Sequence, residues 1–124
     1  MKRNIGLATA ILAMCLQAPG AAQAQYLTKG LGTLTCPEFL DHYAKEGSSA
    51  DLQFFKWAQG YMSGANAQSR AALGISRDLL PGRSQDEIQF LHNYCVQNLG
   101  HKYGEGVRTL YMSLPILPGP GKPR

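Results

Sequence analysis

The chain offers few side chains whose types and spacing suggest chemistry. His92 and Cys95 lie three residues apart, a spacing that can bind a metal ion on a helix. His42 follows Asp41, but adjacent residues of a helix point in different directions, so we expect a solvated ionic face there, and His101 is expected at the surface. No phosphate-binding glycine loop, Gly-x-Ser-x-Gly elbow or His-Glu-x-x-His pair occurs. We therefore predict no catalytic site and no cofactor, and expect that the chain is not an enzyme.

The beginning of the chain has the parts of a secretory signal peptide. A positively charged start precedes an apolar segment over residues 5–16, and a small-x-small motif, Ala-Gln-Ala, follows. We expect residues 1–24 to be removed by cleavage after Ala24 and the mature protein to be exported to the periplasm. The alternative is a lipoprotein signal with an acylated Cys15, although Met14 is bulky where such signals carry a small residue. No later apolar run approaches the roughly 20 residues of a membrane helix, so no membrane span is predicted.

Two cysteines remain after cleavage, Cys36 and Cys95, in a compartment where thiols are oxidised. We therefore predict a disulfide between them and no metal at His92 and Cys95. The link would close a loop of about 60 residues, for which the chain-entropy model gives roughly 4 kcal/mol. That is a large share of the net stability of a small domain.

Composition indicates one small globular domain. The chain has 124 residues, 44% of them hydrophobic and 16% charged, with a net formal charge of +4. Loss of Lys2 and Arg3 with the signal peptide leaves ten of the twelve Lys and Arg against eight Asp and Glu, a charge of +2. The cations are scattered and form no stripe that could follow a phosphate backbone, so we expect no nucleic-acid partner.

Residues 35–114 predict an all-α fold, a small single-domain assembly of four helices with one disulfide. The first helix begins after Thr35, where Glu38 would complete a capping box, and Ser84 with Glu87 predicts the same arrangement at the third helix. The expected helical ranges are 36–45, 50–68 and 84–98, followed by a last helix whose buried stripe is Tyr103, Val107, Leu110, Tyr111 and Leu114.

The segments outside these helices are expected to be irregular. Residues 25–34 are predicted to form a flexible N-terminal arm, and residues 70–83 a loop that could include one helical turn at residues 71–73. Residues 115–124, rich in Pro and Gly, cannot continue a helix and should form an extended, mobile tail. No strand is predicted, because no segment alternates convincingly between apolar and polar residues.

The second predicted helix is the richest in apolar side chains. Its polar residues recur every three or four positions in one narrow stripe, which is typical of a central helix with neighbours on several sides. Gly60 and Gly64 share a face where we expect another backbone to approach closely, since glycine in a helix costs about 0.5 to 1 kcal/mol relative to alanine. Core formation is one interpretation of the aromatic cluster, and a surface for client proteins is the other. The candidate client-binding residues are Phe54, Phe55, Trp57, Tyr61 and Met62.

Three features together resemble the HdeA/HdeB family of small periplasmic acid-stress chaperones. They are Thr-Cys-Pro-Glu-Phe-Leu at residues 35–40, the aromatic-rich central helix, and Asn-Tyr-Cys-Val-Gln-Asn at residues 93–98. The resemblance covers residues 34–114. It implies an all-helical fold with one disulfide, a homodimer at neutral pH, and loosening in acid. The loosened chain would expose apolar surface and hold denatured periplasmic proteins without ATP.

Charge titration gives this hypothesis a physical basis. In strong acid the eight carboxylates lose their charge, so ten Lys and Arg plus three His raise the side-chain charge from +2 toward +13 and favour loosening. Glu38 and Glu87 are the predicted pH-sensing groups, because amides at a helix start stabilise a charged carboxylate and lower its pKa. The stability that such a group contributes is lost as pH falls through its folded pKa.

Two other function classes fit the sequence. One is a periplasmic immunity or inhibitor-type protein that occupies a toxin or another protein partner, which predicts a rigid fold with little change in acid. The other is an envelope adaptor that docks through the Pro-rich residues 115–124.

Overall fold

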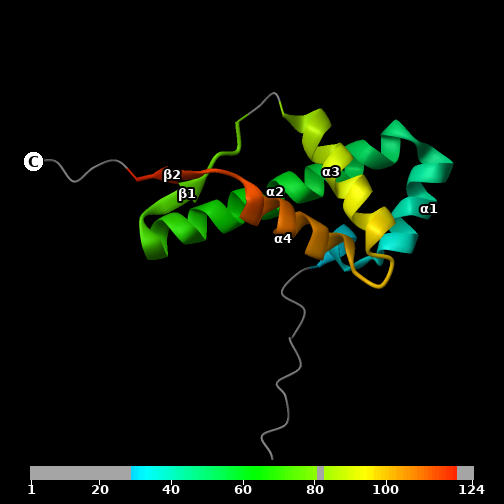
Figure 1. Cartoon of the computed structure of the whole chain (residues 1–124), viewed down its shortest axis with the longest axis horizontal. Helices are drawn as coiled ribbons and strands as arrows, with labels where there is room; N and C mark the ends of the chain where they lie inside the picture. The colour runs from blue at the N-terminus through cyan, green and yellow to red at the C-terminus, as the bar shows by residue number, and fades with distance from the viewer. Residues whose placement is uncertain (1–28, 81–82, 120–124) are drawn as a thin grey trace, which may run out of the picture.

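Four helices make up most of the chain that this computed structural model describes, residues 29–80 and 83–119 (Figure 1). The helices are α1 (Cys36–Glu46), α2 (Ser48–Leu73), α3 (Ser84–Gln97) and α4 (Tyr103–Ser113); a 3₁₀ helix, η1 (Gly30–Thr33), precedes them, and β1 (Ile75–Arg77) and β2 (Ile116–Pro118) are short strands. The predicted all-α, single-domain fold with one disulfide is confirmed. The signal peptide and its cleavage after Ala24 lie outside the described residues. No helix within the described ranges is long and apolar enough for a membrane span.

Capping residues explain where α1 begins and where α1 and α2 end. The Glu38 carboxylate accepts a hydrogen bond from the Thr35 backbone N–H at 2.7 Å, and the Thr35 hydroxyl accepts one from the Glu38 N–H at 3.3 Å. The predicted capping box is therefore confirmed. Gly47 (φ 58°) follows α1, and Gly74 (φ 70°) ends α2 in the left-handed conformation that glycine adopts without steric cost. Because α2 continues to Leu73, the predicted end near residue 68 was too early.

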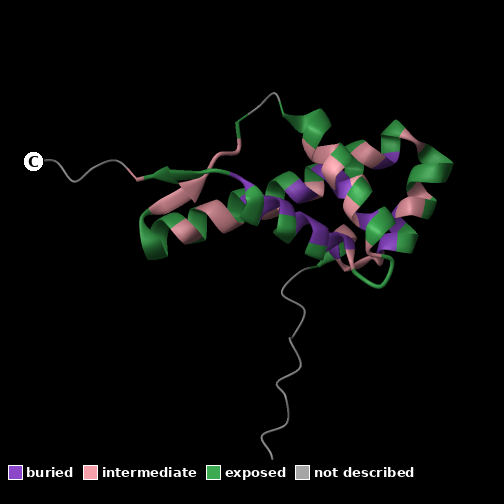
Figure 2. Ribbon diagram, in the orientation of Figure 1, coloured by how far each residue is buried: buried purple, intermediate pink, exposed green. Residues whose placement is uncertain are grey.

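The core lies where α1, α2, α3 and α4 converge. The Cys36–Cys95 disulfide joins α1 to α3, with the two Cα atoms 4.8 Å apart. Beside it, the rings of Phe39, Phe54 and Tyr103 pack with centroids 4.8 to 5.0 Å apart. All five residues of the stripe predicted for the last helix are buried, and Figure 2 shows buried positions concentrated on α4 and on the α2 segment beside it.

Close backbone packing occurs at other glycines than those predicted. Gly60 and Gly64 are exposed, and a Cβ atom added to either would meet nothing within 4 Å, so the predicted close approach there is wrong. A Cβ on Gly104 of α4 would instead lie 2.7 Å from the Gly32 carbonyl oxygen, and one on Gly106 would lie 2.8 Å from the Tyr94 ring. Glycines in α4 therefore let that helix pack directly against η1 and α3.

The described part of the predicted arm is packed against the helices. Its residues 30–33 form η1, the Trp57 indole N–H donates to the Lys29 carbonyl at 2.8 Å, and the Tyr103 N–H donates to the Leu34 carbonyl at 2.9 Å. The prediction of a flexible arm is wrong for residues 29–34, because η1 covers the half-buried Trp57 ring.

A two-stranded antiparallel ribbon, β1 with β2, lies at the end of the molecule opposite α1 (Figure 1). The side chain of Asn66 exchanges two 2.8 Å hydrogen bonds with the backbone of Arg77, so it pairs with the outer edge of β1 as another strand would. The Arg77 guanidinium donates to the carbonyls of Met112 and Leu114 at 2.8 and 2.7 Å. Residues 116–118 are therefore paired, which corrects the predictions of no strand and of a mobile tail for that segment.

Candidate functional site

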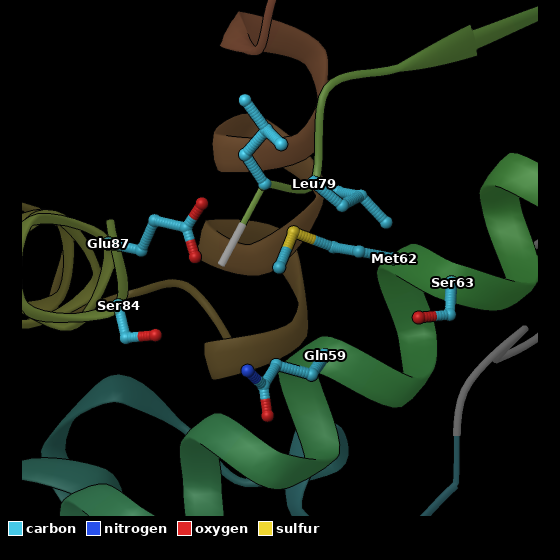
Figure 3. A pocket seen from close by; sticks show the side chains of 7 residues that line it. Gln59, Met62, Ser63, Leu79, Ser84 and Glu87 are labelled. Carbon is cyan, nitrogen blue, oxygen red and sulfur yellow. The ribbon is translucent and has the colours of Figure 1, made fainter. Parts of the chain in front are cut away.

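A groove of about 290 Å³ lies between α2 and α3, and Leu79 and Leu80, which follow β1, also line it. We call it the α2–α3 groove. Its walls combine three apolar side chains with four polar ones, and Figure 3 shows Met62 and Glu87 facing one another across it. The lining residues are Gln59, Met62 and Ser63 of α2, Leu79 and Leu80 of the connecting segment, and Ser84 and Glu87 of α3.

Glu87 is the one charged side chain among these lining residues. Burial raises its pKa, with smaller raising contributions from Asp78 and Asp86, and Arg83 lowers it. The Arg83 guanidinium lies 3.7 Å from the carboxylate of Asp78, whose side chain is the less exposed of the two. Arg83 thus pairs with Asp78 and also acts on Glu87, and the net effect of these surroundings is to raise the pKa of Glu87.

The predicted capping box at the start of α3 is wrong. Arg83 occupies the N-cap position and makes no side-chain capping hydrogen bond, so Ser84 is the first helical residue and not the cap. Glu87 is then one position too far along the helix for its carboxylate to complete a capping box. The pKa of Glu87 is raised by burial in the groove, opposite to the predicted direction.

A smaller cavity of about 100 Å³ lies where α1, α2 and α3 meet. The Oδ1 atom of Asp51 is buried in this region without a hydrogen-bond partner, and burial raises the pKa of Asp51, while His92 lowers it. The His92 ring packs edge-on against Tyr43, with centroids 4.6 Å apart. Cys95 is held in the disulfide and is not paired with His92. Across the described ranges, no three His, Cys, Asp or Glu side chains come together as metal ligands would.

The candidate client-binding residues do not form one exposed surface. Phe54, Phe55 and Met62 are at most 5% exposed, and Trp57 stacks on Tyr61 with centroids 5.6 Å apart, both half-buried. The core interpretation therefore describes these side chains in the folded chain. Met62 is also part of the wall of the α2–α3 groove.

The remaining candidate residues of the sequence lie on exposed faces. His42 and Glu46 are 3.0 Å apart, and the Lys45 ammonium lies 2.6 Å from the Asp41 carboxylate, both as i, i+4 pairs on α1. The predicted solvated ionic face is thus confirmed. His101, also exposed, has its Nδ1 atom 2.6 Å from the Tyr94 hydroxyl.

Two residues given separate roles from the sequence, Met62 and Glu87, therefore share one groove. The sequence did not reveal that Leu79 and Leu80 complete it. The sequence did contain a signal for an apolar contact here, because Leu79 and Leu80 are adjacent leucines between polar residues and a Pro-Gly pair, within residues 76–84. No family model, curated protein or solved structure matches the chain.

Proposed function

We propose that this chain is an exported binding protein of the immunity or inhibitor type. In this proposal, the folded chain occupies a protein partner through the α2–α3 groove and keeps its structure in acid. The observation that carries the proposal is the nature of the contacts that hold the helices together. Among the described residues, no hydrogen bond or ion pair between two of the helices α1 to α4 uses a carboxylate.

Most contacts between the helices are of kinds that protonation of carboxylates does not remove, whereas the electrostatic attraction between Asp51 and His92 does use a carboxylate. The contacts without a carboxylate comprise the Cys36–Cys95 disulfide, the aromatic cluster, and hydrogen bonds between neutral groups, such as the one from the Tyr111 hydroxyl to the Asn66 carbonyl at 2.9 Å. The Arg77 guanidinium ties β1 to the end of α4 through backbone carbonyls and not through a carboxylate. Protonation of the carboxylates therefore leaves the disulfide, the ring contacts and these hydrogen bonds in place.

The shifted pKa values point in two directions, and most of them favour the folded state in acid. The pKa of Glu38 is lowered by hydrogen bonds from the Thr35 N–H and then from its hydroxyl, so its contribution to stability is lost as pH falls through the folded pKa. Burial raises the pKa values of Asp51 and Glu87. The contribution of these two carboxyl groups to stability is fully present below their pKa in the unfolded chain, and it is lost as pH rises through their pKa in the folded chain. Acid thus removes the free-energy cost of a buried charge at Asp51 and Glu87, two of the three carboxylates with shifted pKa values.

The groove supplies the second part of the proposal. A groove that combines apolar side chains with converging polar groups can serve as a recognition site. Leu80 extends the groove to the surface with 59% of its area exposed, where burial by a partner would be favourable.

The acid-chaperone hypothesis stays a prediction and makes the opposite claim about acid. Glu38 favours it, since this capping carboxylate stabilises α1 only while it is charged. Under that hypothesis the helices separate at low pH and uncover Phe54, Phe55 and Met62.

A titration from pH 7 to pH 2.5 in about 0.15 M salt separates the two functions, since this salt limits surface repulsion to about 8 Å. The signals are near-UV circular dichroism and the binding of a fluorescent apolar dye. The binding-protein proposal predicts a retained near-UV spectrum and little dye binding. Loss of the spectrum with strong dye binding, together with suppressed aggregation of an acid-denatured client, would support the chaperone instead.

A further inference from the structure

We propose that the α2–α3 groove receives an arginine side chain of the protein partner, with its guanidinium against Glu87 and its aliphatic stem along Met62 and Leu80. This inference rests on the proposed function and names the chemistry that the site recognises. Three features of the groove lead to it: its charge, its unused acceptors and its apolar walls.

The charge around the groove is negative. Glu87 lies in the wall, and Asp78 and Asp86 are close enough to act on it electrostatically, as is Arg83. Glu87 and the three groups that act on it, two carboxylates and one guanidinium, have a summed formal charge of −2. Arg83 lies against Asp78 and does not line the groove, so a cation from outside would complete the charge pairing.

The polar side chains of the groove offer acceptors that the chain does not use. Within the described ranges, those of Gln59, Ser63, Ser84 and Glu87 make no hydrogen bond to another residue. Figure 3 shows the Ser84 hydroxyl and the Glu87 carboxylate pointing into the same space. A guanidinium carries five donors in a planar fork, and a lysine ammonium only three around a point charge. Several acceptors spread around a carboxylate therefore match arginine better than lysine.

The apolar walls suit the rest of that side chain. Met62 is buried, and Leu79 and Leu80 are the other apolar side chains that line the groove. The methylene stem of an arginine packs along such surfaces while its charged end stays with polar groups. Partial burial also strengthens a guanidinium–carboxylate contact relative to one in open water.

The test uses blocked arginine, N-acetyl-arginine-N′-methylamide, as the probe on the full mature chain at pH 7. Blocked citrulline is the matched control, because it has nearly the same shape without the charge. Binding is followed by NMR from the Met62 methyl group and the backbone amides of Ser84 and Glu87. We expect shifts confined to the groove, a dissociation constant on the order of 10 mM, and binding of citrulline about tenfold weaker.

Variants locate the charge contact. Glu87→Gln should reduce arginine binding to the level of citrulline, whereas Asp86→Asn, the same loss of charge one residue away and outside the wall, should change it less than about threefold. Leu80→Ser removes an exposed wall residue at little risk to the fold and should weaken arginine and citrulline alike.

Three results would overturn the inference: equal binding of citrulline, unchanged binding by the Glu87→Gln variant, or no groove-confined shift at concentrations tenfold above the expected constant. The outcome is independent of the acid titration. A chain that loosens in acid yet binds arginine at pH 7 would refute the proposed function and support the arginine site. A chain that stays folded in acid but does not bind arginine would refute the arginine site and support the proposed function.

Discussion

The same substitution, glycine to alanine, should have opposite effects in α4 and in α2. At Gly104 the added Cβ atom would lie 2.7 Å from the carbonyl oxygen of Gly32. Both atoms belong to backbone, so relief requires α4 or η1 to move. Movement there would strain the hydrogen bond from the Tyr103 N–H to the Leu34 carbonyl, 2.9 Å long. At Gly60 the added atom would meet nothing within 4 Å.

The magnitudes follow from these environments. Overpacking costs about 1 to 3 kcal/mol, and replacing a helical glycine by alanine gains about 0.5 to 1 kcal/mol. Gly104→Ala should therefore lower the free energy of unfolding by about 1 to 2 kcal/mol, and Gly60→Ala should raise it by about 0.5 to 1 kcal/mol. In a domain of this size, 1 kcal/mol shifts Tm by about 4 to 8 °C.

Urea unfolding followed by Trp57 fluorescence measures both changes, since this is the chain's one tryptophan and η1 covers its ring. Gly64→Ala is a second exposed α2 substitution and should behave like Gly60→Ala. A Gly104→Ala variant as stable as the parent would refute the close packing of α4 on η1. Destabilisation by Gly60→Ala would show that this face of α2 is covered in solution.

The other predictions concern the disulfide, the ribbon and two carboxylates. Replacing Cys36 and Cys95 by serine should lower the free energy of unfolding by about 2 to 5 kcal/mol, measured by urea unfolding. Asn66→Ala removes three hydrogen bonds and should cost about 1 to 3 kcal/mol, with faster hydrogen exchange in β1 than in α1; equal exchange in both would contradict the pairing. Glu38→Gln should be less stable than the parent at pH 7, and the difference should vanish as pH falls through the lowered folded pKa. Glu87→Gln should be at least as stable as the parent at pH 7, and the free energy of unfolding of the parent should rise relative to that of the variant as pH falls. A relative fall for the parent in acid would contradict the conclusion that burial raises the pKa of Glu87.

Local signals predicted the helices of this fold well. The box of Thr35 and Glu38 fixes the start of α1 through hydrogen bonds within four residues, and the apolar spacing of α4 identifies its buried face. The expectation that Cys15 is removed with a signal peptide left Cys36 and Cys95 as the one possible pair, and the predicted disulfide is confirmed.

Features that depend on contacts between distant segments were missed. Residues 116–118 form a strand only because β1 lies beside them and Asn66 satisfies the other edge of β1. Periodicity marks Gly60 as a packing position, but the residues that pack against α2 are set by the arrangement of the other helices. Ser84 with Glu87 fits a capping box in sequence, but Arg83 occupies the N-cap position, and Glu87 lines the groove instead.

The candidate site was predicted only in part for the same reason. Met62 and Glu87 were singled out, but a groove requires α2, α3 and the segment between them to be placed in space. Leu79 and Leu80 lie in that segment, where sequence patterns specify no fixed position.

Acid stability of the folded chain is the claim that separates a binding protein from an acid chaperone. The free energy of unfolding in urea, measured from Trp57 fluorescence at pH 7 and at pH 3 in the same salt, tests it most directly. A folded baseline at both pH values, with the emission of a covered indole and a cooperative transition, is the expected result. An unfolded-like emission at pH 3 without urea would contradict it.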